Sequence, residues 1–462
     1  MSTPATGAGA AGGAAELIRS RRYLALLLLA AAIGAPISAL AYFFLYVVNR
    51  LQHLAFTSLP SGLGFHGTPV WWSLPLLAIA GLLVAATIKY LPGGGGHSPA
   101  DGFHAGGAPI PSQLPGVILA ALATLTSGAV LGPEAPLIAI GGGLAVCVVR
   151  LSRRDVPASA EQMVAGAGSF AAISTLLGSP LLGGVLLMEA IGLSGVMLEL
   201  VLMPGLLAAG VGALIFTGLD AWTGLGAFSL KIPHVPHVGA PTVSEFGWAF
   251  VIGVAAALTG IGIRRLALVI RPLVERRMLL FTPVVGLAVG GLAVAYAEGS
   301  GRSPSEVLFS GQSALPKLVE HASSYSAWIL LLLIACKGLG YALSLSSFRG
   351  GPVFPSMFLG AAGGMALSHV AGLTMVAGTA MGIGAMCAVM LRLPITAVLL
   401  ATLLFFSDGL AVMPVVIVAV VVAYVLSSRW SPQASSEAKP AQPKEPVPAA
   451  GGSAAASSSP AS

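Results

Sequence analysis

Residues 127–145 read SGAVLGPEAPLIAIGGGLA and carry one charged side chain, that of Glu134. No other side chain between His104 and Arg150 is formally charged, so this carboxylate lies in an apolar segment long enough to cross a lipid bilayer. Ionisable groups at that depth usually face the interior of a helix bundle or a water-filled path, and they are functional candidates by default. Glu134 is therefore the first candidate for a functional residue.

Gly132, Pro133 and Pro136 surround Glu134 and indicate the local backbone. Proline suits the first turn of a helix, and glycine allows the backbone to approach another group closely. We therefore expect a helix that begins inside the membrane, with free N–H groups and the positive end of its dipole beside the carboxylate. These groups would attract an anion, whose place the carboxylate could take. The alternative is a structural cap, in which Glu134 only satisfies those N–H groups.

The composition is that of a polytopic membrane protein. Of 462 residues, 56% are hydrophobic and 8% are charged, whereas about a quarter of an ordinary soluble protein is charged. The apolar runs leave room for on the order of ten or more membrane-crossing helices. The 60 Gly and 32 Pro indicate that several helices are broken or closely packed.

Composition also predicts the domain boundaries. The Ala-, Gly-, Ser- and Pro-rich ends, 1–18 and 431–462, are expected to be disordered, and no regulatory domain fits in the second. The transmembrane domain would occupy 19–430, with halves at about 23–219 and 246–430 joined by a wetter linker, 220–245. Basic residues flank the first and last apolar runs, so both termini are expected in the cytoplasm and the protein in the plasma (inner) membrane. The first run is interpreted as an anchor rather than a removed signal peptide.

Two pairs of motifs indicate that the halves are related. GPEAP at 132–136 has a counterpart in GPVFP at 351–355, and SPLLGGVLL at 179–187 is echoed around 393–400 at a nearly equal offset. Paired segments interrupted by Gly and Pro indicate a transporter built from repeats, with its site at their interface. Coincidence in a Gly- and Pro-rich chain is the alternative.

The breaks near 93–99, 132–136 and 350–355 are candidate helix starts close to mid-membrane, and a further break lies near 428–435. If the first three converge, several unpaired backbone N–H groups would meet in one place. Such a place stabilises a monovalent anion without a full positive charge. Conduction requires binding that is weak enough for release.

With these motifs in this order, the chain resembles the CLC family of chloride channels and chloride/proton antiporters. Residues 132–136 are similar to the family's G-x-E-G-P, 351–355 to its G-x-F-x-P, and 95–99 to its G-S-G-I-P. The resemblance runs from about Tyr23 to Trp430. It implies an all-α membrane protein with an inverted-topology repeat of broken helices, a homodimer in the lipid bilayer, and no cofactor.

The resemblance also implies a role for each motif. Glu134 would be the gating glutamate, which occupies an anion site when ionised and leaves it when protonated or displaced. Burial disfavours its charged form, while a helix end favours it. The implied anion-binding positions are Gly96, His97, Ser98, Gly132, Pro133, Ala135, Val353 and Phe354.

Several positions depart from the family pattern. Gly96 stands where the family has an anion-contacting serine, and Ser98 would replace that hydroxyl only if the backbone were re-aimed. Fewer side-chain donors would define the site, so the preferred anion is left open. Further departures are at Pro133, Ala135, Val353 and Ser435, the last near the place of a pore tyrosine.

Proton coupling depends on another position. The family's antiporters relay protons through an internal glutamate, and matching Pro180 and Gly183 places Ala190 there, with Glu189 one residue earlier. One residue along a helix turns a side chain by about 100°, so Glu189 is expected to face elsewhere. A passive or weakly coupled pathway is therefore favoured.

The sequence allows two interpretations of some other polar residues. Lys337 and Arg349 would either raise the local anion concentration, or snorkel or pair with a buried acid. His97 could make conduction sensitive to pH because it lies beside the presumed filter. Neither the loop histidines nor the isolated cysteines predict a metal site.

The predicted function is transmembrane chloride (anion) transport, as a CLC-type channel or a chloride/proton antiporter. The alternative is an inverted-repeat secondary carrier of another solute, in which Glu134 binds a proton or a cation. An intramembrane enzyme is disfavoured because no His/Asp/Glu or Ser/His cluster gathers at membrane depth. The expected partners are chloride, protons where coupling exists, the bilayer and a second subunit, with no nucleic acid.

Overall fold

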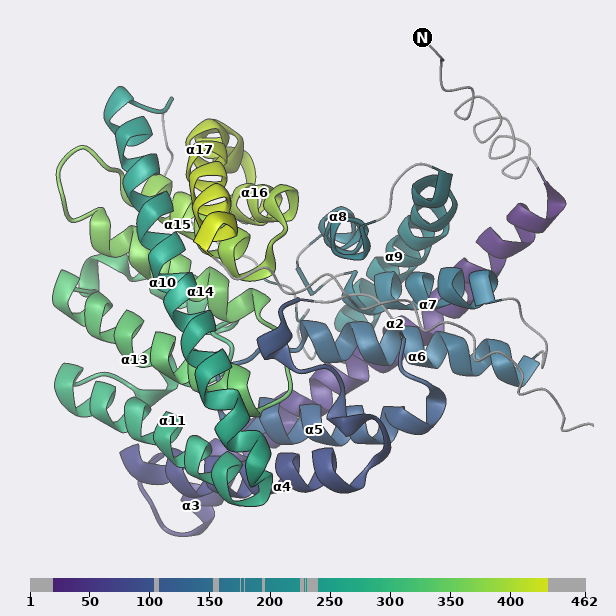
Figure 1. The fold of residues 1–462 in the computed structure, drawn as a ribbon, viewed down its shortest axis with the longest axis horizontal. Coiled ribbons are helices and arrows are strands. Elements are labelled where there is room, and N and C mark those ends of the chain that lie inside the picture. The colour runs from purple at the N-terminus through teal and green to yellow at the C-terminus, as the bar shows by residue number, and fades with distance from the viewer. Residues whose placement is uncertain are drawn as a thin grey trace, which may run out of the picture.

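The computed structural model describes residues 20–103, 108–152, 158–174, 176–177, 179–192, 196–224, 228, 230 and 240–430. Within these ranges the chain is helical, as expected, and the described residues form no strand (Figure 1). The first half contains α2 (Arg21–His53), α3 (Leu59–Gly62), α4 (Ser73–Tyr90), α5 (Leu114–Ser127), α6 (Glu134–Ser152), α7 (Ala158–Ile173), α8 (Pro180–Ile191) and α9 (Val196–Thr223). The second contains α10 (Val243–Arg276), α11 (Met278–Ser300), α12 (Ala314–Glu320), α13 (Ala327–Ser347), α14 (Val353–Leu367), α15 (Met375–Leu391), α16 (Pro394–Leu403) and α17 (Phe406–Trp430).

Short helical turns join these helices. One π-helical turn, Leu54–Ser58, extends α2 into α3. The described 3₁₀ turns are Val70–Trp72, Pro92–Gly95, Pro99–Asp101, Pro111–Gln113, Pro304–Glu306 and Ala322–Ser324. Proline begins several of them because its fixed φ suits a first helical position.

Long and short helices are combined in the described chain. Eight helical spans are long and apolar enough to cross a membrane. Four apolar helices, α8, α14, α15 and α16, have 10 to 17 residues, which is short of the roughly 20 that a full crossing requires. Helices too short to cross can end at membrane depth only where protein covers their polar ends. The all-α, polytopic architecture with broken helices is confirmed.

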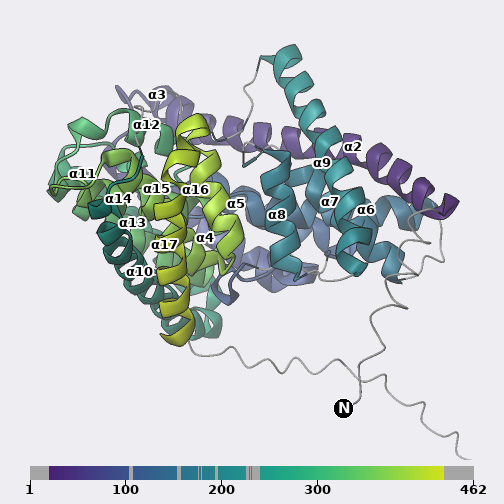
Figure 2. The same cartoon turned by 90° about the horizontal axis from the view of Figure 1, so that it is seen from above.

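Helices α6–α9 of the first half and α10–α17 of the second lie on different sides of the molecule, whereas α3 and α4 lie beside α11. In Figure 1, α10–α17 lie on the left and α6–α9 on the right. The halves are joined where α4 packs on α11 and where α8 packs on α16, and Figure 2 shows the α8 and α16 ribbons side by side. Both contacts connect a helix of one half to a helix of the other.

Close packing of α14 on α15 fixes the position of the α14 amino end. A Cβ at Gly364 or at Gly360 would overlap the backbone of Gly378 or Gly382 on the facing helix. Small residues of this kind let two membrane helices approach closely. The amino end of α14 is therefore held rigidly in the buried interior.

The sequence predicted breaks near 93–99 and 428–435, and the described helices allow both to be compared with the structure. The break at 93–99 starts no α-helix, because the described chain there forms only the 3₁₀ turns Pro92–Gly95 and Pro99–Asp101. Gly93 to Gly96 all have positive φ, between 58° and 94°, which a helix does not allow. The break expected near 428–435 is not contradicted, since α17 is described to Trp430 and the residues after it lie outside the described chain.

Several other expectations fall on chain that the structure does not describe. These are both tails, half of the linker at 220–245, and the residues Ser435, His104, His234 and His237. The domain boundaries therefore stay a prediction. Helix α12 and the turn before it were not expected from the sequence.

Candidate anion site

The two repeat motifs meet at a pair of glycines. The Gly132 N–H donates to the Gly351 carbonyl at 2.8 Å, and the Gly351 N–H donates back to the Gly132 carbonyl at 2.7 Å. Helix α6 begins at Glu134 and α14 at Val353, each shortly after its bridged glycine. Two helix amino ends, far apart in sequence, therefore lie beside each other inside the protein.

The Glu134 carboxylate fills the space between these helix ends. Its side chain is fully buried, and Oε1 accepts a hydrogen bond from the Val353 N–H. The N–H groups of Glu134 itself and of Phe354 also face the carboxylate. The positive ends of two helix dipoles therefore favour a negative charge at this place.

The carboxylate is only partly satisfied there. Oε2 is buried and has no hydrogen-bond partner among the described residues. A buried carboxylate oxygen without a partner costs free energy, since it has lost its hydration. The docked carboxylate is thus held by backbone donors on one side and unsupported on the other.

Both bridging glycines are required by the space that the carboxylate occupies. A Cβ on Gly132 or on Gly351 would overlap the Glu134 carboxyl group. Neither residue has a positive φ, so this requirement is one of volume rather than of backbone conformation. The sequence predicted glycine for close approach, and the group approached is the carboxylate.

The residues on either side of Glu134 in the sequence line two cavities, and the Glu134 side chain lines neither of them. A small cavity of about 60 Å³ is lined by Ala135 and Pro136 on one side of it. A larger cavity of about 610 Å³ is lined by Leu131 and Pro133 on the other. The small cavity is large enough for a few water-sized molecules. Residues next to Glu134 in the chain therefore face both cavities.

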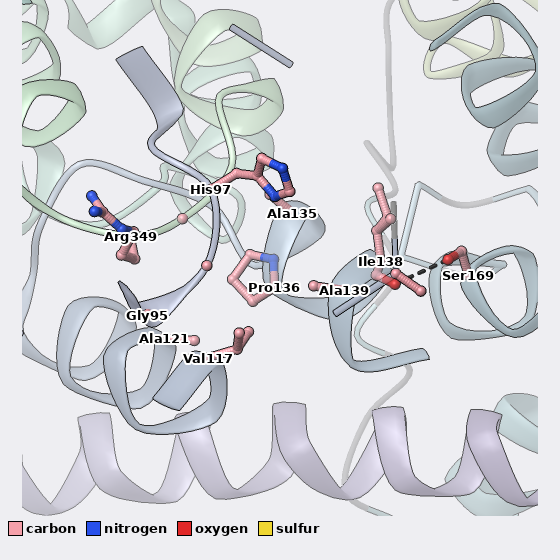
Figure 3. A pocket seen from close by; sticks show the side chains of 13 residues that line it. Gly95, His97, Val117, Ala121, Ala135, Pro136, Ile138, Ala139, Ser169 and Arg349 are labelled. Carbon is pink, nitrogen blue, oxygen red and sulfur yellow. Dashed lines mark hydrogen bonds between the residues drawn. The ribbon is translucent and has the colours of Figure 1, made fainter. Parts of the chain in front are cut away.

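The first motif lines the small cavity together with the second and third. Gly95, Gly96 and His97 face Ala135 and Pro136 across it, and Gly350 completes the wall (Figure 3). Figure 3 shows the His97 ring near Ala135, at the start of α6. Of the proposed anion-binding residues, three line this cavity, Gly96, His97 and Ala135, and five do not, Ser98, Gly132, Pro133, Val353 and Phe354. The three motifs do converge, and their roles in anion binding stay predictions.

Arg349 lines the same cavity with its aliphatic stem. Figure 3 shows its guanidinium turned away from Pro136, and Nε donates to the Gly94 carbonyl at 3.3 Å. The same glycine-rich loop is also tied to α10 by an ion pair between Asp101 and Arg271. Arg349 therefore holds the loop that carries Gly96, a role that neither sequence reading contained.

Glu189 serves as a helix cap rather than as a free acid. Its carboxylate accepts hydrogen bonds from the Ile395 N–H at 3.0 Å, the Thr396 N–H at 2.8 Å and the Thr396 hydroxyl at 2.7 Å. These groups lie at the amino end of α16, where backbone donors lack partners within the helix. Glu189 therefore faces the amino end of α16, the neighbouring Ala190 carries no proton acceptor, and their place in a proton path stays a prediction.

The structure contradicts the interpretation that Lys337 snorkels or pairs with a buried acid. Its side chain is fully buried, so it does not snorkel, and no carboxylate in the described chain lies within ion-pair distance of it. Its Nζ instead donates to four backbone carbonyls, those of Glu306, Val307, Leu308 and Phe309. One signal of this arrangement is visible in the sequence, a lysine in an otherwise apolar run.

No metal centre is formed by the residues that the structure describes. Nowhere among them do three His, Cys, Asp or Glu side chains gather as a metal ion would require. The described cysteines Cys147, Cys336 and Cys387 are free.

Comparisons with known proteins agree with the geometry. The family model described as "Voltage gated chloride channel" matches residues 76–428. Proteins named "Putative ion-transport protein YfeO" from Escherichia coli strain SE11 and from Shigella boydii serotype 4 are each 31% identical over 356 residues. The match covers 76% of this chain and 81% of each of theirs.

Solved structures share the fold at lower identity. A slow cyanobacterial Cl⁻/H⁺ antiporter superposes with a TM-score of 0.69 at 17% identity, over 87% of this chain and 94% of its own. A CLC-type fluoride/proton antiporter gives 0.61 at 19% identity, over 88% and 96%. A eukaryotic CLC transporter gives 0.63 at 16% identity, over 88% and 72%. These likenesses show the fold.

Proposed function

The chain belongs to the voltage-gated chloride channel (CLC) family, and from this premise we propose that it moves chloride or a similar small anion past Glu134, which acts as the gate. The observation that carries the proposal is the position of one carboxylate. Glu134 lies at the paired amino ends of α6 and α14, where a permeating anion would find the same donors, and its neighbours in the chain line two cavities.

The mechanism is a competition for backbone N–H groups. In the docked state the Val353 N–H is held by the Glu134 carboxylate, and an anion cannot use it. Protonation of the carboxylate, or its displacement by an anion, frees this donor and opens the place that the carboxylate occupies. Because the donors are partial charges at helix ends, the anion binds weakly enough to leave again.

The same donors disfavour the alternative carrier. A cation bound at Glu134 would face the N–H groups of Val353 and Phe354 and the positive ends of two helix dipoles. A protonated carboxylate is compatible with that field, but a metal cation is not. Anion transport therefore fits the site better than cation transport.

Proton coupling is proposed to be weak. Ala190 offers no group that could relay a proton, and Glu189 is engaged by three donors at the amino end of α16. Proton movement to Glu134 from that side would depend on water alone. Anion flux through the pathway is therefore proposed to be passive, or only loosely coupled to proton movement.

Assembly and location follow from the family. We propose a homodimer in the plasma (inner) membrane, with both termini in the cytoplasm and one pathway in each subunit. Apolar side chains on the outside of α9, α16 and α17, among them Leu214, Ile395 and Leu410, are exposed in the single chain. These residues are available to a second subunit or to lipid.

Chloride and proton fluxes measured together in proteoliposomes test the function. The wild-type protein should release chloride when a potassium ionophore balances the charge, and Glu134→Gln should change that rate. An absence of chloride flux under every gradient would contradict anion transport. Uphill proton movement at a fixed ratio to chloride would contradict weak coupling while leaving anion transport in place.

A further inference from the structure

Lys337 has an unusual environment for a buried cation. Its Nζ lies 3.0, 3.0, 3.1 and 3.2 Å from the carbonyl oxygens of residues 306, 307, 308 and 309, and 4.5 Å from the centre of the Phe358 ring. Burying an ammonium group is costly unless its donors are satisfied. Here the compensation comes from consecutive carbonyls and a ring face. The ammonium therefore determines the shape of this stretch, which we call the carbonyl turn (306–309).

The carboxylate next to Lys337 is already occupied. Glu306 accepts hydrogen bonds from the hydroxyls of Tyr296 and Tyr325, and Arg302 lies 3.7 Å from it. Burial, followed by the Glu306 charge, raises the pKa of Tyr325, so that hydroxyl stays protonated and donates. Lys337 thus acts on the backbone of the carbonyl turn and not on the Glu306 side chain.

The carbonyl turn holds the segment that leads to Glu134. Phe309 has a φ of 60°, a left-handed conformation that is uncommon for a residue other than glycine. In this conformation its N–H donates to the Gly128 carbonyl at 2.9 Å. Gly128 ends α5, and residues 128–133 then run directly to the gate.

Helix α13 also holds this segment directly. The Ser344 hydroxyl accepts a hydrogen bond from the Val130 N–H at 3.0 Å. Ser344 lies seven residues after Lys337, and positions seven apart share one face of a helix. One face of α13 therefore fixes residues 128–130 twice, through Ser344 and, by way of the carbonyl turn, through Lys337.

We propose that Lys337 is a positioning residue for the Glu134 gate. Its ammonium orders the carbonyl turn, the turn anchors Gly128, and the anchored segment aims the Glu134 carboxylate at the Val353 N–H. The inference rests on the proposed gating role of Glu134 and extends it to a residue that touches neither the anion nor the gate.

The test compares Lys337→Met in two backgrounds, with Glu134 present and with Glu134→Ala. Methionine keeps the length and apolar stem of the side chain but cannot bind the carbonyls. With Glu134 present, the docked carboxylate is held less well, and chloride efflux should rise about three- to tenfold, since tenfold corresponds to about 1.4 kcal/mol. In the Glu134→Ala background the same substitution should change efflux by less than about twofold, because no carboxylate remains to be aimed.

Lys89→Met is the matched control. Lys89 is an exposed lysine at the end of α4 that also faces an aromatic ring, that of Tyr90 at 5.3 Å. Its loss removes one positive charge without touching the carbonyl turn, and efflux should stay at the wild-type rate. Glu134→Ala alone reports separately on the gate: if it leaves efflux unchanged, the proposed function fails before Lys337 is considered.

Several outcomes would overturn the role of Lys337. Efflux that changes by the same factor in both backgrounds would show a general structural or electrostatic effect. Unchanged efflux in Lys337→Met would show that the carbonyl turn does not reach the gate. If Lys337→Met gives no monodisperse protein, Lys337→Gln takes its place, since a neutral amide has only two N–H donors for the four carbonyls. A rise of about twofold that requires Glu134 supports the proposal, and no change opposes it.

Discussion

Glu134 and Glu189 are two acids in comparable positions with different surroundings. Each reaches across to the amino end of a helix in the other half, Glu134 to α14 and Glu189 to α16. Glu189 is half-buried and both of its oxygens have partners. Glu134 is fully buried and one of its oxygens has none.

The number of hydrogen-bond partners distinguishes a carboxylate that caps a helix from one that can act as a gate. A helix end attracts both carboxylates, so attraction alone does not give either of them a function. Glu189 has a threonine hydroxyl in addition to two N–H groups, and solvent reaches part of its side chain. Glu134 has backbone donors only, and its neighbours in the chain line cavities that an anion could use. An acid that is incompletely satisfied can be displaced, and one that is fully satisfied is not.

Removing the Glu134 carboxylate should therefore change transport, and removing that of Glu189 should change stability. The largest effect is expected at Glu134. Glu134→Ala should raise chloride efflux about tenfold or more, because a hydrogen bond to a charged group is worth about 1.5–3 kcal/mol. The vacated donors should also bind chloride, so its unfolding temperature in detergent should rise with chloride concentration more than that of the wild type. Equal chloride dependence in the two proteins would show that Glu134 does not occupy an anion site.

A steric test of the gate leaves its charge in place. Gly351→Ala puts a Cβ where the Glu134 carboxyl group lies, so the carboxylate should be displaced and efflux should rise toward that of Glu134→Ala. Overpacking of this kind also costs about 1–3 kcal/mol, which a lower unfolding temperature would report. Gly363→Ala is the control, because a Cβ there meets open space on α14. Wild-type efflux in Gly351→Ala would contradict the docked position of the carboxylate.

At Glu189 the expected effect is on stability and not on transport. Glu189→Ala leaves the first N–H groups of α16 without partners, and losing such a cap costs about 1 kcal/mol. The unfolding temperature should fall, while chloride efflux and its response to Glu134→Ala should stay as in the wild type. A large change in proton movement upon Glu189→Ala would instead make Glu189 part of a proton path.

The sequence identified Glu134 through its isolation, since one acid in an apolar span is visible without coordinates. It also paired the two GP-containing motifs, and Gly132 and Gly351 do bond to each other. Neither the orphaned Oε2 nor the cavities beside it could be foreseen, because they depend on how α6 and α14 pack. For the same reason the sequence separated Glu189 from the gate but did not find its partners on α16.

The first motif and Lys337 show where pattern reasoning fails. Residues 93–96 have positive φ in succession, and runs of glycine predict backbone freedom without saying which conformation is chosen. Lys337 is satisfied by carbonyls of a turn about thirty residues earlier in the chain. Main-chain partners leave no trace in the side-chain pattern, so the sequence suggested an acid or the membrane surface instead.

The smallest effect is expected when one hydrogen-bond donor of the Glu189 cap, the Thr396 hydroxyl, is removed. Thr396→Val removes the hydroxyl that Glu189 accepts at 2.7 Å and leaves the Ile395 and Thr396 N–H groups in place. One hydrogen bond is worth about 0.5–1.5 kcal/mol, so the unfolding temperature should fall by less than in Glu189→Ala. In the Glu189→Ala background the valine should cost almost nothing further, since the carboxylate that it served is gone. Additive losses would mean that the hydroxyl stabilises α16 by itself, and that the completeness of the Glu189 cap does not depend on it.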